Sequence, residues 1–158
     1  MLYYVENIPM DGQFIVHVGD INKATRDGCP ESSYIATRNI LRNSVVPLFM
    51  TPGDNDWNDC PDIDGAWENF ATHFIGFDQH WEHDLPVQYQ PSRDENFSMW
   101  METFGTLIIG LNLVGGTVHD EIEWETRLVS QLAWTMELIA ANYESLEKIV
   151  LFDLFQWF

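Results

Sequence analysis

The sequence predicts an α/β fold, and three observations support this prediction. Short apolar runs alternate with segments of helical periodicity, which is the order expected for buried strands covered by helices. Two of the runs end in a glycine and an acidic residue, a tight turn that directs a side chain outward from a strand end. The chain has 158 residues, of which 46% are hydrophobic, so one domain over residues 1–158 can bury a real core.

The first half of the chain predicts two strands and two helices. Residues 13–18 and 45–50 are β-rich apolar runs that favour buried strands. A helix is expected to open at Pro30, because proline suits a first helical turn. Asp64 is the expected N-cap of a second helix. Four apolar side chains in this helix follow helical spacing: Trp67, Phe70, Ala71 and Phe74.

The second half predicts a hairpin, a long helix and a last strand. Residues 77–95 show no periodicity, and we expect an irregular segment there. Alternating apolar residues near 97–101, a turn at Gly105 and the run 106–112 indicate an antiparallel hairpin. Residues 119–143 form the longest predicted helix, followed by a buried strand at 148–152. The expected core face of that helix consists of Leu128, Leu132, Met136 and Ile139.

The charge of the chain excludes two classes of partner. Seven basic residues against 25 acidic ones give a net charge of −18. Such a surface repels the phosphates of nucleic acids and anionic membranes, so we expect neither partner. No segment reaches the roughly 20 apolar residues of a membrane span. No signal peptide is visible at the start, and the oligomeric state is left open.

Oxygen-bearing side chains follow both predicted strands of the first half. Asp20 comes directly after one strand, and Asp54, Asn55 and Asp56 follow the other. Functional groups of open α/β sheets gather beyond the carboxyl ends of the strands. Hard oxygen ligands from separate strands are what a pair of divalent metal ions needs. The alternative is a solvated acidic turn.

A family resemblance rests on the order of these motifs. A strand with GD, a helix, a strand with PGDNDW, a strand reading LIIGLN, a long helix and a further strand resemble the calcineurin-like metallophosphoesterases. The subgroup with a PGDNEW signature followed by a cysteine is the most similar, and the resemblance runs from about Phe14 to Phe152. It implies a sandwich of two mixed β-sheets flanked by helices. It also implies two divalent metal ions, with iron, manganese and zinc as candidates.

The resemblance assigns roles to individual residues. Asp20 matches the metal-bridging carboxylate, and Asn55 matches the asparagine that ligates one metal. Asp56 stands where most members place a catalytic histidine, so it is the candidate catalytic residue. Cys29 and Cys60 are expected to form a disulfide, which indicates an extracellular or secretory location for the full-length protein. By themselves the two cysteines are equally compatible with free buried thiols.

The resemblance is partial, because the first and last family motifs have no counterpart. The last strand leads to Asp153 where a ligating histidine is expected, and Asp153 is therefore the third candidate metal ligand. The implied function is metal-dependent hydrolysis of small phosphate mono- or diesters. We expect weak metal binding and poor hydrolysis from this chain alone, because it looks like the middle of a larger enzyme. The alternative is a non-catalytic acidic domain that binds cations or a partner.

Several other residues have competing interpretations. His80 and His83 are close enough to share a metal ion, but surface histidines in an aromatic loop are the simpler interpretation. His17, inside a strand, is expected to be a hydrogen-bonded core histidine. Arg127 either pairs with local acids or packs toward the strand that ends at Asn112. The tryptophans at helical spacings are predicted to be core residues: Trp67, Trp124 and Trp134.

Overall fold

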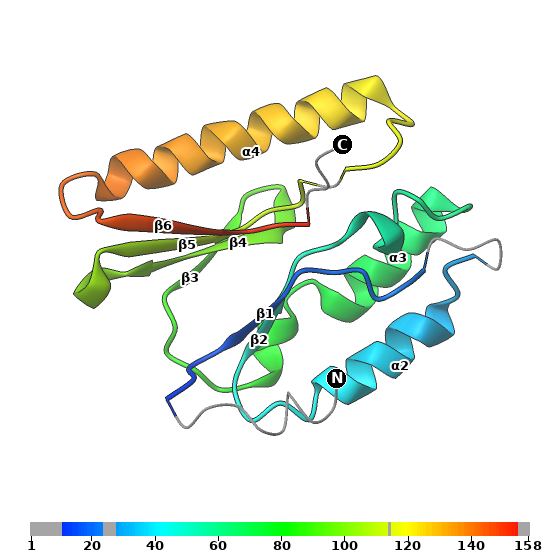
Figure 1. The fold of residues 1–158 in the computed structure, drawn as a ribbon, viewed down its shortest axis with the longest axis horizontal. Coiled ribbons are helices and arrows are strands. Elements are labelled where there is room, and N and C mark those ends of the chain that lie inside the picture. Colours follow the sequence, from blue (N-terminus) through cyan, green and yellow to red (C-terminus); the bar gives the residue numbers. More distant parts are fainter. Residues whose placement is uncertain (1–10, 24–27, 114, 155–158) are drawn as a thin grey trace.

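The computed structural model describes residues 11–23, 28–113 and 115–154, and over these ranges the chain is an α/β fold with two sheets and three α-helices (Figure 1). The predicted fold class is therefore confirmed at this level. The helices are α2 (Glu31–Leu41), α3 (Ile63–Phe74) and α4 (Glu121–Asn142). Three short 3₁₀ segments are η1 (Asp54–Asp56), η2 (Phe77–His80) and η3 (Glu102–Phe104).

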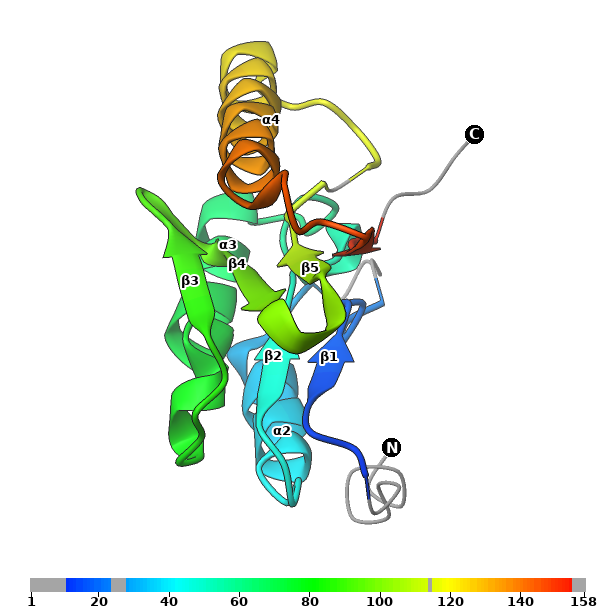
Figure 2. The same ribbon diagram turned by 90° about the vertical axis from the view of Figure 1, so that its left-hand side faces the viewer.

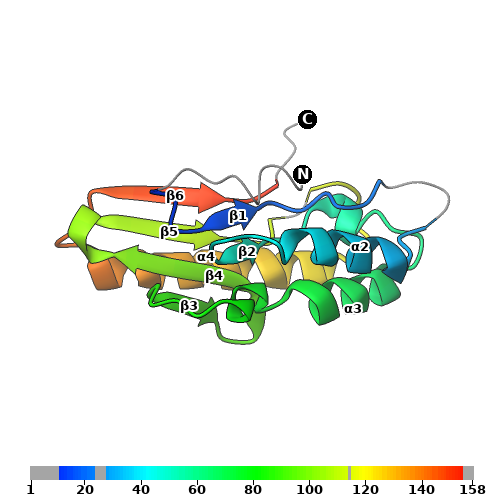
Figure 3. The same ribbon diagram turned by 90° about the horizontal axis from the view of Figure 1, so that it is seen from below.

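The strands form one two-stranded and one four-stranded sheet. β1 (Ile15–His17) and β2 (Leu48–Met50) pair in parallel, as expected for strands joined through a helix. The larger sheet has the order β3-β4-β5-β6, with β6 at one edge and β3 at the other (Figure 3). Its β5–β6 pair is parallel and its other pairs are antiparallel. Its strands are β3 (Val87–Gln90), β4 (Arg93–Met101), β5 (Thr106–Gly110) and β6 (Lys148–Phe152).

Alternating side chains of the strands build the layers. Leu48 and Met50 of β2 pack against α2 and α3, whereas Phe49 between them faces the other sheet. β5 repeats this pattern, since Leu107 packs toward α4 and Ile108 joins Phe49. Successive side chains of a strand point to opposite faces, so each central strand serves two apolar clusters. Figure 2 shows the resulting order of α4, the larger sheet, the β1–β2 pair and α2.

The predicted elements are largely present, with differences at their boundaries. α3 begins two residues earlier than predicted, because its N-cap is Asp62 and not Asp64; the Asp62 side chain accepts a hydrogen bond from Gly65 N. The segment 77–95, which we expected to be irregular, contains η2, β3 and the start of β4. β3 lies at a sheet edge, its first three residues are half-buried or exposed, and its buried residue is the polar Gln90, so the apolar signal of a strand is weak.

The buried face of α4 matches the predicted one only in part, since Leu128 and Ile139 are half-buried and Ile139 packs against the apolar cluster beneath the helix. Leu132 and Met136 are 64% and 57% exposed, and the buried side is formed instead by Arg127, Gln131, Trp134 and Leu138. Hydrogen bonds made by two polar side chains of the helix explain which face is buried. The side chains of Arg127 and Gln131 both donate to the carbonyl of Asn112 at the end of β5, at 2.8 and 3.0 Å, which fixes the rotation of the helix.

β6 also departs from its prediction as a buried strand. It pairs with β5 alone among the described strands, and its apolar residues Ile149, Val150 and Leu151 are 43%, 37% and 47% exposed. Edge position explains this, because an edge strand has a neighbour on one side only. None of the described helices is both long and apolar enough to cross a membrane.

Candidate functional site

Two glycine turns meet at the carboxyl ends of β1 and β2. A Cβ placed on Gly19 would lie 2.0 Å from the backbone nitrogen of Gly53, so the two backbones are in direct contact. Gly19 also has a φ of +82°, in the left-handed region that favours glycine. A Cβ on Gly53 would lie 2.6 Å from the nitrogen of Asp20. Both glycines are therefore required by the close approach of these turns.

The carboxylate of Asp56 joins the same two turns. Its Oδ2 accepts hydrogen bonds from the backbone nitrogens of Asp20 and Gly53, at 2.8 and 2.9 Å. Its Oδ1 accepts from Ile21 at 2.7 Å and Asn22 at 3.3 Å. Successive backbone N–H groups in a turn with positive φ form a concave anion site, and here the anion is part of the chain. We call Asp56 and these four N–H groups the Asp56 cluster.

Burial of the Asp56 cluster determines what Asp56 can do. Asp56 has no exposed surface, and burial raises its pKa to about 6 although the four N–H donors act in the opposite direction. Both oxygens face backbone donors. The position of Asp56 is that of a structural residue, because its carboxylate forms hydrogen bonds with both loops. The catalytic role that we predicted for Asp56 stays a prediction.

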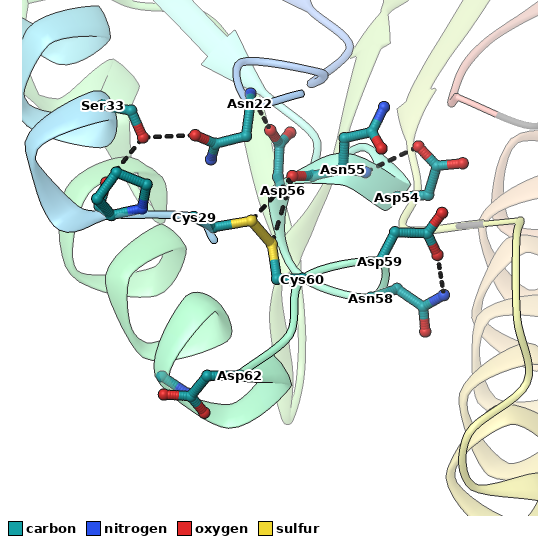
Figure 4. Close-up of a disulfide and its surroundings, with 12 residues drawn as sticks. Asn22, Cys29, Ser33, Asp54, Asn55, Asp56, Asn58, Asp59, Cys60 and Asp62 are labelled. Carbon is teal, nitrogen blue, oxygen red and sulfur yellow. Dashed lines mark hydrogen bonds between the residues drawn. A yellow bond between two sulfur atoms is a disulfide. The ribbon is translucent and has the colours of Figure 1, made fainter. Parts of the chain in front are cut away.

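A second acidic side chain of the turn lies beside Asp20. The buried Asp54, 5% exposed, has a raised pKa because of its burial and the neighbouring charge of Asp20. Its Oδ1 accepts a hydrogen bond from Asn55 N at 2.8 Å (Figure 4). Asp20 is exposed and has a φ of 58°. The two strand ends thus bring together a pair of carboxylates, one exposed and one buried.

The other predicted ligands lie near this pair. Asn55 is half-buried in η1, next to Asp54 (Figure 4). Asp153 is half-buried and follows β6 directly. The next residue, Leu154, places its Cδ2 2.7 Å from where a Cβ on Gly53 would be, so the end of β6 reaches the same turn. The ligand roles of Asp20, Asn55 and Asp153 remain predictions.

The donor set differs from that of a two-metal centre. Over the described ranges, no group of three or more His, Cys, Asp or Glu side chains is placed to hold one metal ion. A paired centre needs several anionic or imidazole ligands for each ion. A paired centre would therefore need ligands beyond those that the described residues bring together, and the two-metal centre stays a prediction. Two carboxylates with an amide oxygen nearby suit a single hard cation that keeps several waters.

The disulfide between Cys29 and Cys60 confirms the pairing that the resemblance implied. The two Cα atoms lie 5.8 Å apart. The sulfurs lie 3.6 and 3.5 Å from the carbonyl oxygen of Asn55, so the bridge packs against η1 (Figure 4). It connects the start of α2 to the loop that carries the candidate ligands, and thereby restricts the positions of that loop.

Three of the described histidines, His17, His80 and His83, have structural partners. His17 Nδ1 accepts from Gly19 N at 3.1 Å, and burial lowers its pKa, as expected for a neutral core histidine. His80 bonds the carbonyl of Phe77, whereas His83 contacts Asp78 at 3.3 Å. The two histidines thus have separate partners.

Sequence reasoning missed two features of this site. It did not identify Asp54 as the carboxylate beside Asp20. It also did not recognise that Asp56 accepts hydrogen bonds from backbone N–H groups of both loops. The only local signal was the repetition of glycine before an acid in both turns. Which acid faces which loop depends on contacts between residues more than 30 positions apart.

Comparison with protein-family models found no match for the chain. Searches of curated proteins and of solved structures also found no significant match.

Proposed function

We propose that the chain is a metallophosphoesterase-like domain in which Asp20 and Asp54 bind a divalent cation. The observation that carries the proposal is the pairing of these carboxylates at the carboxyl ends of two adjacent parallel strands. Two neighbouring carboxylates repel each other unless a proton or a cation compensates them. The end of an α/β sheet is also the usual position of a functional site.

The layer order supports the fold part of this proposal. Phe49 of the smaller sheet packs with Phe97 and Ile108 of the larger one, and helices cover the outer faces of both sheets. Two sheets packed face to face between helices is the arrangement that the resemblance implies. We therefore propose that the chain is part of a metallophosphoesterase-like sandwich.

The chemistry follows from the ligands. A hard cation bound here would polarise a phosphate oxygen of a small phosphate ester. Asp20 and Asp54 would hold the cation in their ionised forms, and the amide oxygen of Asn55 would be a third ligand. Oxygen donors of this kind suit Mg²⁺ or Mn²⁺. With two carboxylates, we expect weak cation binding and slow hydrolysis of phosphate mono- or diesters.

The proposal is tested by titrating Mn²⁺ into the wild-type chain and into the variants Asp54→Asn and Asp20→Asn. Both variants should bind Mn²⁺ at least tenfold more weakly, while Asp84→Asn, an exposed acid elsewhere, should bind like the wild type. The same proteins are assayed with an aryl phosphate and added Mn²⁺. Equal Mn²⁺ binding by Asp54→Asn and the wild type would exclude the site.

Stability gives an independent measurement. Asparagine keeps the acceptor for Asn55 N but removes the charge beside Asp20. The metal-free Asp54→Asn variant should therefore be at least as stable as the wild type at pH 7, and Mn²⁺ should raise its melting temperature less. A marked loss of stability without metal would indicate that Asp54 is a structural residue instead.

A further inference from the structure

A cleft lies between α3 and the first turns of α4. In Figure 1, α3 and the start of α4 (yellow) are both at the right-hand side of the molecule. The cleft consists of a cavity of about 590 Å³ and a neighbouring one of about 420 Å³. Both are lined by Trp57, Ile63, Asp64 and Glu123. We call them together the α3–α4 cleft. The described residues that line it do not include Asp20 or Asp54, so it is distinct from the strand-end site.

Tryptophan rings form the walls of the α3–α4 cleft. Trp57 and Trp67 lie with ring centroids 5.2 Å apart, and Trp124 lines the smaller cavity. Sequence analysis predicted Trp67 and Trp124 to be core residues, and each is only half-buried. The face of an indole ring is electron-rich and attracts cations within about 6 Å of its centroid.

The charge of the lining is strongly negative. One guanidinium, that of Arg93, is shared between Glu95 at 3.5 Å and Glu123 at 3.8 Å. Glu95 is buried, and this burial raises its pKa. His119 also lines the cleft. The acidic residues of the lining are Asp62, Asp64, Asp94, Glu95, Asp120 and Glu123.

The guanidinium group of Arg127 already contacts two of the tryptophan rings that line the cleft. The Arg127 guanidinium carbon lies 5.3 Å from the ring centroid of Trp57 and 4.9 Å from that of Trp124. Its Nε donates to Glu123 at 3.0 Å. The same tryptophans and the same acid that face the cleft therefore have the chemistry to hold a cation.

Buried polar atoms beside the cleft lack partners in the described structure. Asn112 lines the larger cavity and is 1% exposed, and its Oδ1 accepts no hydrogen bond from the described residues. Gln131 Oε1, whose amide nitrogen bonds the Asn112 carbonyl, is also unpartnered there. Unpaired buried acceptors are uncommon in native proteins and point to a missing donor. Two donors, Trp57 Nε1 and Arg127 Nη2, also have no acceptor among the described residues.

We propose that the α3–α4 cleft binds an organic cation, an ammonium or guanidinium group, through its tryptophan walls, its carboxylates and Asn112. The N–H donors of the cation complement Asn112 and Glu95, and its charge complements the acidic lining. A carbonyl on the same ligand would complement the unpartnered donors. Such a cation comes either from a free amine or from a basic side chain of a peptide.

Calorimetric titration at low ionic strength with three probes tests this proposal. Nα-acetyl-arginine methylamide carries the guanidinium and two carbonyls, and the citrulline analogue is its neutral counterpart of the same shape. n-Butylguanidine has the same single positive charge and an alkyl chain but lacks the amides. The arginine probe should bind at least tenfold more tightly than the citrulline probe. Butylguanidine binding as tightly as the arginine probe indicates a free amine, and weaker butylguanidine binding indicates a peptide side chain.

Variants then locate the site. Asp64→Asn lies on the exposed rim of both cavities and should weaken binding of the arginine probe at least fivefold. Glu68→Gln, one turn further along α3 and outside the lining, should change it less than twofold. Glu95→Gln tests the buried acid and should also weaken binding. Asp54→Asn should bind the probe like the wild type, which separates this proposal from the strand-end cation site.

Three results would overturn the proposal. These are equal binding of the arginine and citrulline probes, no binding of any cationic probe at 10 mM, and unchanged binding by both Asp64→Asn and Glu95→Gln.

Discussion

Asp56 and Asn112 are both buried polar residues that follow a strand, but their surroundings differ. The Asp56 carboxylate accepts four backbone N–H groups from two loops. The side-chain oxygen of Asn112 has no donor among the described residues, while its backbone carbonyl accepts two. A buried polar group with all its hydrogen bonds made fixes its neighbours, whereas one without a partner is costly unless something binds it.

The comparison distinguishes buried polar groups that stabilise the fold from buried polar groups that can bind a ligand. In the Asp56 cluster the chain itself supplies the anion for a concave set of N–H groups, so little remains for an external ligand. Beside the α3–α4 cleft, acceptors and acids remain incompletely paired next to open volume. We therefore expect substitutions in the Asp56 cluster to change stability, and substitutions around the cleft to change binding.

The largest effect is expected from Asp56→Ala. It leaves four N–H groups without their acceptor and should lower the free energy of unfolding by about 4–5 kcal/mol. Urea unfolding followed by tryptophan fluorescence measures the change. A loss below about 1 kcal/mol would show that the two loops hold together without Asp56.

A somewhat smaller loss, of about 3–4 kcal/mol, is expected for Gly19→Ala, because the added methyl group would overlap the backbone of Gly53. Gly28→Ala is the matched control. Gly28 has a similar φ of +78°, and among the described residues no atom lies within 4 Å of an added Cβ, so we expect only the backbone strain of about 1 kcal/mol. Similar losses for both variants would contradict the close contact of the two glycine turns.

The next effect is pH-dependent and comes from the raised pKa of Asp56. The carboxyl has a pKa of 3.8 when unfolded and about 6 when folded, so folding takes up a proton between these values. Its contribution to stability is therefore complete below about pH 4 and is lost as the pH rises through 6. The full loss is about 3 kcal/mol, from two pKa units at 1.36 kcal/mol each.

The pH effect is isolated with Asp56→Asn, which cannot ionise. His17, whose pKa is lowered by burial, has the opposite pH dependence, so the informative quantity is the difference between the wild type and the variant. Urea unfolding between pH 4.5 and 7.5 should show a steeper decline for the wild type. Parallel curves would mean that Asp56 keeps an ordinary pKa.

The smallest effect is expected for Gln131→Met beside the α3–α4 cleft. The change removes one hydrogen bond to the Asn112 carbonyl, which still accepts from Arg127, and it also removes an unpaired acceptor. Replacing a half-satisfied amide by an apolar side chain of similar length should change stability by less than about 1 kcal/mol. A loss as large as that of Asp56→Ala would mean that both sites are structural.

The sequence by itself determined the elements with strong local patterns. The apolar runs that became β1, β2 and β5 were recognisable because alternate side chains serve two apolar clusters, which leaves a nearly continuous apolar run. The helices were recognisable from their periodicity. The glycine-acid turns marked the strand ends, and the pairing of Cys29 with Cys60 followed from the family resemblance.

Only the tertiary structure decided how these elements face each other. The rotation of α4 follows from the hydrogen bonds of Arg127 and Gln131 to Asn112, whereas its apolar pattern alone predicted a face on which Leu132 and Met136 are in fact exposed. The exposure of β6 follows from its place at the sheet edge.

The candidate site divides in the same way. The sequence placed Asp20, Asn55 and Asp56 at strand ends, because an acid after a glycine turn is a local feature. Which carboxylate meets which loop was decided by contacts between residues far apart in the chain: Asp56 reaches the N–H groups of residues 20–22, and Asp54 lies beside Asp20. The α3–α4 cleft combines residues from four segments of the chain. Local patterns determine which residues can be buried or polar, whereas the partner of each polar group is determined by the segments that folding brings together.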